Sequence, residues 1–248
     1  MENNIKATTL GPIYKDLYFN KNKISICVPT WEKHGYGRQY LNELLKSIEK
    51  QTYTNYNVIV SDHSLDDSIK SLLDTYKDLD ITYIKNNNDL GNGPANTNNA
   101  IKHSDGDIIK VMFQDDLLFN DKTLEIINNV FLNLDVNWVV NGCNHTTNGV
   151  DFVRPMVPSW NNNILYGKNT ISSPSVLSFR NKNVEFFDEK LVMLMDCEFY
   201  YRLFTKYGHP HIIKDILITN RIHEHQISSM YTGDINDEIK YVKQKYIL

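Results

Sequence analysis

The sequence lacks a long apolar run, a strong net charge and a secretory signal. None of its apolar runs approaches the ~20 residues that a membrane-spanning helix needs. The first residues do not show the charged-then-apolar pattern of a signal peptide. The net charge is −4 over 248 residues, which gives no electrostatic reason to expect nucleic acid or an anionic membrane as a partner. We therefore expect no nucleic-acid partner, no transmembrane segment and a chain long enough for a large core.

Cysteine is also scarce, with only Cys27, Cys143 and Cys197. Their number is odd and no two are close in sequence, which favours a reducing, cytoplasmic setting over a disulfide framework. Cys27 and Cys197 lie among apolar residues, so we expect inert thiols in the core.

The first half of the chain contains a regular alternation of strand and helix patterns. Short apolar runs predict strands at 24–28, 57–61, 81–84 and 108–113. Apolar residues at helical spacing predict helices at 36–50 and 66–76, and Pro94 is well placed to begin a helix that ends near 104. This alternation predicts an α/β fold in which helices flank a mostly parallel central sheet.

The second half is less regular. We expect helices at 123–134, 196–207 and 235–246 and strands at 137–141, 175–180 and 212–218, with an Asn- and Gly-rich segment at 142–170. The predicted organisation is an N-terminal arm at 1–23, two halves at 24–119 and 120–232 that share one core, and a C-terminal helix at 233–248.

Two adjacent acids, Asp115 and Asp116, follow the buried-strand pattern that begins at Ile108. The carboxyl end of a central strand is where open α/β sheets bind ligands. Two neighbouring carboxylates repel each other unless a positive group lies between or beside them, and hard divalent cations take oxygen ligands. The alternative is a pair of helix-capping residues, because a helix is expected to begin near Asp121. The two residues alone leave both interpretations open.

Asp196 is expected at the start of a helix, among Met193, Leu194, Met195 and Cys197. Apolar neighbours raise the pKa of a carboxyl group, while the helix N-terminus opposes that rise. A carboxylate of this kind could serve as a general base. The alternative is that Asp196 only caps the helix.

Other polar residues also have two interpretations. His223 and His225 would share a face if they lay on a strand, which allows a metal pair, although such histidines are more often structural. Asp62 could bind a ligand or form a strand-end turn, and Arg221 could bind phosphate or pair with a structural acid. The glycines at 91 and 93 form a Gly-x-Gly pattern, a weak signal for phosphate binding.

In order along the chain, these segments resemble those of a family 2 glycosyltransferase with the GT-A fold. The segments that carry the resemblance are Pro29-Thr-Trp31, Arg38 to Tyr53, Val58-Ile-Val-Ser-Asp62, Asn98, Ser104 to Ile109, Gln114-Asp-Asp116, Asp196 to Arg202 and Arg221-Ile-His223. Each motif alone is weak, but their order and spacing agree from about residue 24 to 229, which makes the set specific.

The resemblance implies transfer of a sugar from a nucleotide-diphosphate donor, with UDP expected, to a hydroxyl of a carbohydrate or glycoconjugate acceptor. It also implies inversion at the anomeric carbon and Mn²⁺ or Mg²⁺ as cofactor. The first half would bind the donor and the second the acceptor. The resemblance implies a nucleotide site made of Pro29, Thr30, Asp62, Asn98, Asp115 and Arg221, with Asp62 at the base and Asp115 at the ribose. It implies Asp116 and His223 as metal ligands and Asp196 as general base.

The chain departs from the family pattern at several positions. Phe113 and Met195 stand where acids are common, as does His63, and an insertion is expected between residues 31 and 38. The departures at Phe113 and Met195 keep a rival hypothesis open, a degenerate member that binds a nucleotide or sugar without catalysis. Retention of Asp116 and Asp196 together with His223 argues against that rival.

A nucleotidyltransferase on a similar sheet is a second rival. Such an enzyme would need a glycine-rich, basic loop directly after the first strand. The segment Pro29-Thr-Trp-Glu-Lys-His-Gly35 contains one glycine and no such cluster, which disfavours this hypothesis.

Overall fold

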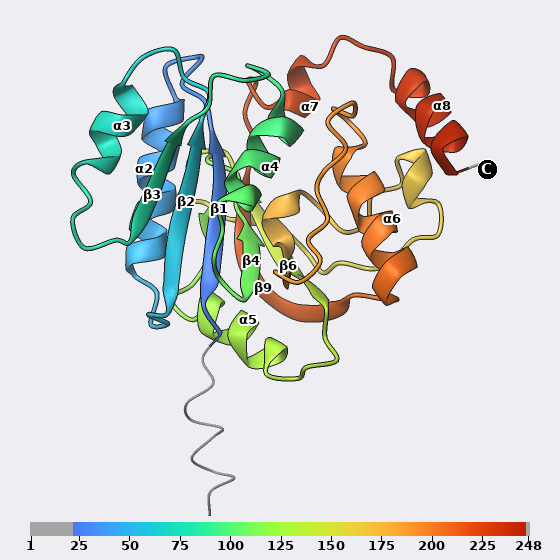
Figure 1. The fold of residues 1–248 in the computed structure, drawn as a ribbon, viewed down its shortest axis with the longest axis horizontal. Helices are drawn as coiled ribbons and strands as arrows, with labels where there is room; N and C mark the ends of the chain where they lie inside the picture. Colours follow the sequence, from blue (N-terminus) through green and yellow to red (C-terminus); the bar gives the residue numbers. More distant parts are fainter. Residues whose placement is uncertain (1–21, 247–248) are drawn as a thin grey trace, which may run out of the picture.

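The computed structural model describes residues 22–246, so nearly all of the expected N-terminal arm at 1–23 lies outside the described residues. The first half alternates strands and helices as predicted (Figure 1). Its elements are β1 (Ile24–Thr30), α2 (Gly37–Glu49), β2 (Tyr56–Asp62), α3 (Ser68–Leu73), β3 (Ile81–Lys85), α4 (Gly93–Lys102) and β4 (Ile108–Val111). β1, β2 and β4 are buried along almost their whole length because helices cover both faces of the sheet.

The second half contains more strand than its sequence pattern predicts. Its elements are β5 (Leu117–Leu118), α5 (Thr123–Phe131), β6 (Trp138–Thr146), β7 (Val153–Met156), the 3₁₀ helices η1 (Ile164–Tyr166) and η2 (Pro174–Val176), β8 (Leu177–Arg180), α6 (Met195–Tyr207), β9 (His211–Arg221), α7 (Ile227–Met230) and α8 (Ile235–Tyr246). Strands β6 and β9 extend past the expected 141 and 218. Polar residues in these extensions hid the strand pattern, yet they are buried, among them Asn144, Thr219 and Asn220.

All strands belong to one sheet in the order β3-β2-β1-β4-β8-β6-β9-β5, with β7 paired to β6 beside this path. The predicted parallel arrangement holds for β3, β2, β1 and β4 and for the pair β6 and β9. β8 enters between β4 and β6 and is antiparallel to both, and β5 and β7 also pair antiparallel. The sheet is therefore mixed in the second half, where antiparallel neighbours need no helical crossover.

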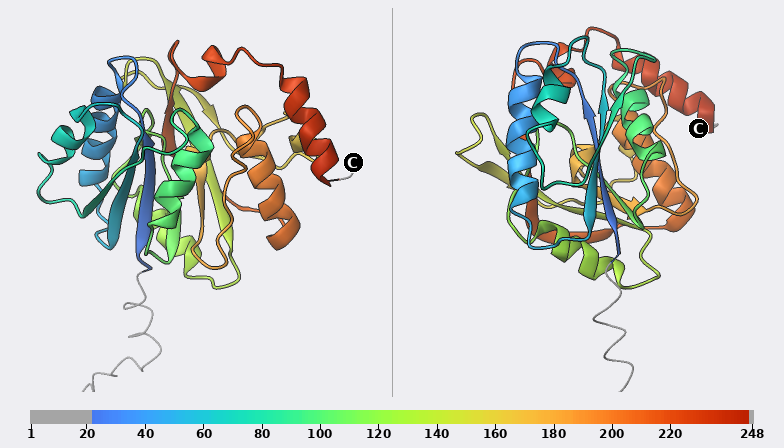
Figure 2. Two further views of the ribbon diagram at one scale, coloured as in Figure 1. Left: turned by 45° about the horizontal axis from the view of Figure 1, so that its top comes forward. Right: turned by 60° about the vertical axis from the view of Figure 1, so that its left-hand side comes forward.

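Helices cover the sheet on both faces and also close one end of the molecule. Figure 2 shows α2 and α4 on opposite faces, with α6 beyond α4 on the same side. The buried face of α2 consists of Leu41, Leu44, Leu45 and Ile48, at the helical spacing that predicted it. Within residues 22–246, no helix combines the length and apolarity needed to cross a membrane.

Candidate active site

A cavity of about 850 Å³ opens where β1 and β4 end and extends to the start of α6. It is lined by segments that lie far apart in the sequence: the end of β1, the paired acids after β4, the residues before α6 and the chain that follows β9. All but two of the predicted site residues line it, namely Pro29, Thr30, Asp115, Asp116, Asp196, Arg221 and His223. The exceptions are Asp62 and Asn98.

Asp62 lies behind the cavity wall and is fully buried. Its carboxylate accepts hydrogen bonds from the Ser64 N–H at 2.8 Å and the Tyr83 hydroxyl at 3.0 Å. The Lys85 ammonium lies 3.6 Å away, and the Thr30 hydroxyl at 3.4 Å separates Asp62 from the cavity. These contacts match the alternative interpretation of Asp62 as a residue of a strand-end turn.

The sequence-based prediction missed other residues at this end of the cavity. His63 follows Asp62 and lines the cavity, together with Trp31, Gly91 and Asn96. Gly91 has a φ of +87° and a Cβ there would lie 3.1 Å from the Trp31 ring, so the close approach requires glycine. This contact joins the loop before α4 to the residue after β1, and phosphate binding by the Gly-x-Gly pattern stays a prediction.

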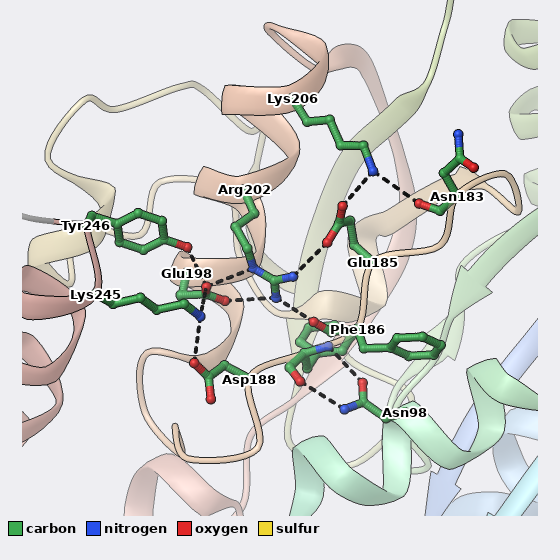
Figure 3. A network of polar contacts seen from close by, with 11 residues as sticks. Asn98, Asn183, Glu185, Phe186, Asp188, Glu198, Arg202, Lys206, Lys245 and Tyr246 are labelled. Atoms are coloured by element: carbon green, nitrogen blue, oxygen red, sulfur yellow. Dashed lines mark hydrogen bonds and ion pairs between the residues drawn. The ribbon is translucent and has the colours of Figure 1, made fainter.

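Asn98 has a structural position on α4. Its side-chain amide donates to the Phe187 carbonyl at 2.9 Å and to Glu189 at 2.8 Å, and its oxygen accepts from the Phe187 N–H at 2.7 Å. Figure 3 shows Asn98 turned toward this segment. Its assignment to the nucleotide is not supported, because every polar atom of its side chain binds residues outside the cavity wall.

The paired acids follow β4 and do not cap a helix, because β5 intervenes and α5 begins at Thr123. One oxygen of Asp116 accepts the Arg221 N–H at 2.9 Å, and the other lies 3.4 Å from the Ser173 hydroxyl. Burial, together with the charge of Asp115, raises the pKa of Asp116. Asp115 instead faces His223, with its Oδ2 2.9 Å from His223 Nε2.

Asp115 and His223 form a direct hydrogen bond, and the same spacing would fit two neighbouring ligands of one cation. Ligands about 2.1 Å from an octahedral metal lie about 3.0 Å apart when they are adjacent, and these two atoms are 2.9 Å apart. The structure thus favours Asp115 over Asp116 as the partner of His223. Among residues 22–246 no group of three or more His, Cys, Asp and Glu side chains could hold a metal. A cation here would need phosphate or water oxygens as further ligands.

His225 does not share this position, because the strand that would have placed it on the same face as His223 ends before both residues. β9 ends at Arg221, and the two imidazole rings are 6.4 Å apart. The His225 ring stacks on His34 at 4.6 Å, in the segment before α2 where an insertion was expected. Tyr40 lies beside His223, with ring centroids 5.1 Å apart.

Arg221 pairs with a structural acid, as its alternative interpretation proposed. Its guanidinium forms an ion pair with Glu43, donates to the Asp115 carbonyl at 3.1 Å and lies 4.5 Å above the Tyr40 ring. The side chain is only 3% exposed. The assignment of the Arg221 side chain to phosphate is therefore not supported, although its backbone N–H holds Asp116.

Asp196 lies in the first turn of α6 and lines the cavity. The capping position is Leu194, so Asp196 does not occupy it, although its carboxylate accepts an N–H group of the first turn. Its carboxylate accepts the Asn169 amide at 2.7 Å and the Cys197 N–H at 2.6 Å. Burial raises the pKa of Asp196 to about 6, although these hydrogen bonds oppose the rise. The sequence did not indicate Asn169, which lies in the Asn-rich segment without regular pattern.

Comparison with known proteins agrees with this arrangement. The family model described as Glycosyl transferase family 2 matches residues 25–194. An uncharacterized glycosyltransferase of Rickettsia typhi is 24% identical over 231 residues, covering 86% of this chain and 68% of that protein.

Solved structures show the same fold. S. aureus TarS in complex with UDP-GlcNAc has a TM-score of 0.68 at 20% identity, covering 91% of this chain and 66% of that one. The mannosyltransferase PcManGT from Pyrobaculum calidifontis, in complex with GDP-Man and Mn²⁺, has a TM-score of 0.61 at 16% identity, covering 84% and 59%. The predicted GT-A-like α/β fold is confirmed, and the chain belongs to glycosyltransferase family 2.

Proposed function

We propose that this glycosyltransferase moves a hexose from a UDP-sugar to a hydroxyl of a carbohydrate or glycoconjugate, with inversion and with Mn²⁺ or Mg²⁺. The observation that carries the proposal is the placement of Asp196 in the same cavity as the pair Asp115 and His223. A donor lying between them would have its diphosphate near the pair and its anomeric carbon toward Asp196.

The nucleoside would lie at the end of β1. Pro29, Thr30, Trp31, His63 and Gly91 line this part of the cavity and offer aromatic and backbone surfaces. UDP follows from the family resemblance, and TarS supports it because that structure contains UDP-GlcNAc. PcManGT contains GDP-Man, so the fold accommodates a second base and the choice needs measurement. We propose that the half at 24–119 binds the donor and that the half at 120–232 binds the acceptor.

Asp115 and His223 would hold the cation, with the donor phosphates and water as the remaining ligands. This revises the sequence-based assignment, which gave the cation to Asp116 and the ribose to Asp115. Asp116 instead accepts the Arg221 N–H and fixes the turn that presents Asp115. A bound divalent cation supplies Lewis-acid stabilisation of the charge on the departing diphosphate.

Asp196 would act as general base. It takes the proton of the acceptor hydroxyl while that oxygen bonds to the anomeric carbon and the bond from this carbon to the diphosphate breaks. A pKa of about 6 leaves the carboxylate ionised at neutral pH and still basic enough to accept the proton. Attack from the side opposite the diphosphate gives inversion through an oxocarbenium-like state.

The test is the release of UDP from a panel of UDP-sugars with Mn²⁺, with and without EDTA, where water takes the place of the acceptor hydroxyl. The wild type should release UDP at a rate that EDTA abolishes. Asp196→Asn should bind UDP with unchanged affinity and lose ~10²-fold or more in turnover. Turnover equal to wild type in this variant would remove Asp196 from the mechanism.

A non-catalytic nucleotide-binding protein remains the rival function. The departures at Phe113 and Met195 favour it, since both residues line the cavity where family members often have acids. Tight UDP binding without UDP release from any donor would support this rival. The cytoplasmic setting also stays a prediction, and the three free, buried cysteines support it.

A further inference from the structure

We propose that Glu238, on α8, is a positioning residue that holds the segment carrying Asp196 in its reactive place. The inference rests on the proposed function, because it concerns the same base. Glu238 lies 44 residues along the chain from Leu194, the closest backbone donor it binds. The family model ends at residue 194, so Glu238 lies outside the matched part of the chain, whereas the backbone it binds lies at the end of that part.

The Glu238 carboxylate binds the start of α6 through successive backbone N–H groups. One oxygen accepts from Val192 at 3.0 Å and Met193 at 3.2 Å, and the other accepts from Met193 at 3.0 Å and Leu194 at 2.8 Å. The first N–H groups of a helix have no partner within it, and Leu194 at the capping position provides no side-chain acceptor. Glu238 therefore holds, from another helix, the N–H groups of the three residues that lead into α6, while the Asp196 carboxylate accepts the Cys197 N–H in the first turn.

Glu238 binds residues that line the cavity but does not line the cavity itself. Val192, Met193 and Leu194 line the cavity, whereas Glu238 does not. The carboxylate thus holds the backbone of residues that line the cavity without lining it itself. It is only 7% exposed, and its negative charge lies at the N-terminal end of the helix dipole, where it is favourable.

A second set of contacts fastens α8 to both ends of the same segment. The Lys245 ammonium bridges Asp188 at 2.6 Å and Glu198 at 2.7 Å, one on each side of Asp196 in the sequence (Figure 3). The Tyr246 hydroxyl also donates to Glu198 at 2.6 Å. Because α8 is held at these points, Glu238 is fixed relative to the first turn of α6.

Small displacements of a base have large consequences, since a shift of about 1 Å can cost about 10²-fold in rate. Without Glu238, the N–H groups before α6 would turn to water and the first turn would be free to move. Asp196 would then be displaced although it is not itself substituted. Loss of Glu238 should therefore lower turnover and leave UDP affinity unchanged, because the residues proposed to bind UDP lie at the other end of the cavity.

The test compares Glu238→Ala with Lys240→Ala, an exposed residue of the same helix whose ion pair within residues 22–246 is with Asp237. In UDP-sugar turnover, Glu238→Ala should lose about 10-fold to 10²-fold in kcat with UDP affinity within about twofold of wild type. Acetate fits the space left by the missing carboxylate, so it should restore part of kcat. Lys240→Ala should match wild type. Unchanged kcat in Glu238→Ala, or lost kcat without acetate rescue, would overturn the inference.

A second readout does not depend on activity. Asp196 should titrate near pH 6 by ¹³C NMR in wild type, with Asp196→Asn identifying its signal, and closer to its ordinary value of 3.8 in Glu238→Ala. A pKa that does not change in Glu238→Ala would overturn the positioning role. If the wild type releases no UDP from any donor, the proposed function fails, but the NMR comparison still decides whether Glu238 positions Asp196.

Discussion

Replacing Asp196 by Asn should make the stability of the protein less dependent on pH while it removes activity. The pKa of Asp196 rises from 3.8 to about 6 on folding because burial disfavours the charged form. Between these values the folded state binds more protons than the unfolded state, so stability falls as pH rises and the loss is complete above about pH 6. The difference corresponds to about 3 kcal/mol, and screening by water at a carboxyl reachable from the cavity reduces it to about 1–2 kcal/mol.

The substitution also changes a hydrogen bond. Asn169 donates its amide to Asp196 and uses its own oxygen to accept from Ile171 and Ser172, so it cannot turn over to suit a second amide. One donor would then face another, at a cost of about 1 kcal/mol. This cost does not depend on pH between 4 and 8, whereas the burial of charge does. The change of the stability difference with pH therefore reports the Asp196 carboxyl group and not the altered hydrogen bond.

The measurement is the Tm of wild type and Asp196→Asn from pH 4 to pH 8. As the pH rises from 4 to 8, the Tm of Asp196→Asn should increase relative to that of wild type by about 2–8 °C. Asp74→Asn is the control, because Lys70 lowers the pKa of that exposed carboxyl and the sign should be opposite and small. A constant difference in Tm for Asp196→Asn would show that the carboxyl is not desolvated in the folded protein, and the argument for its raised pKa would fail.

Three further outcomes are expected. Mn²⁺ should raise the Tm more with UDP than without it. Asp115→Asn should remove this synergy between Mn²⁺ and UDP, whereas His225→Ala should keep it. Equal loss of the synergy in both variants would contradict the metal assignment. His63→Ala should weaken UDP binding in isothermal titration, and a clear preference for GDP over UDP would refute the donor base. Glu43→Gln should lower stability by about 1–3 kcal/mol, because it leaves the buried Arg221 guanidinium without its ion-pair partner; unchanged stability would mean that this pair is not structural.

Local patterns were enough to predict the first half of the fold. Continuous apolar runs marked β1, β2 and β4, and the 3.6-residue spacing of Leu41, Leu44, Leu45 and Ile48 marked α2, because burial on both faces of a parallel sheet leaves a clear signal in the sequence. The same logic placed the paired acids at the end of β4. It failed for the extensions of β6 and β9, where buried polar residues broke the apolar pattern.

Only the tertiary structure decided which residues act together in the site. Adjacent acids are equivalent by sequence, but the turn after β4 directs Asp115 toward His223 and Asp116 toward the Arg221 backbone. Likewise, nothing in the local sequence distinguishes the buried Glu238 from an exposed glutamate. Apart from the Tyr231 hydroxyl, its hydrogen-bond partners in the described part of the chain are backbone N–H groups, which nearly every residue carries, so these contacts leave no trace in the sequence. The sequence by itself determined the family, the order of the elements and the acids at the site, whereas long-range packing determined their partners.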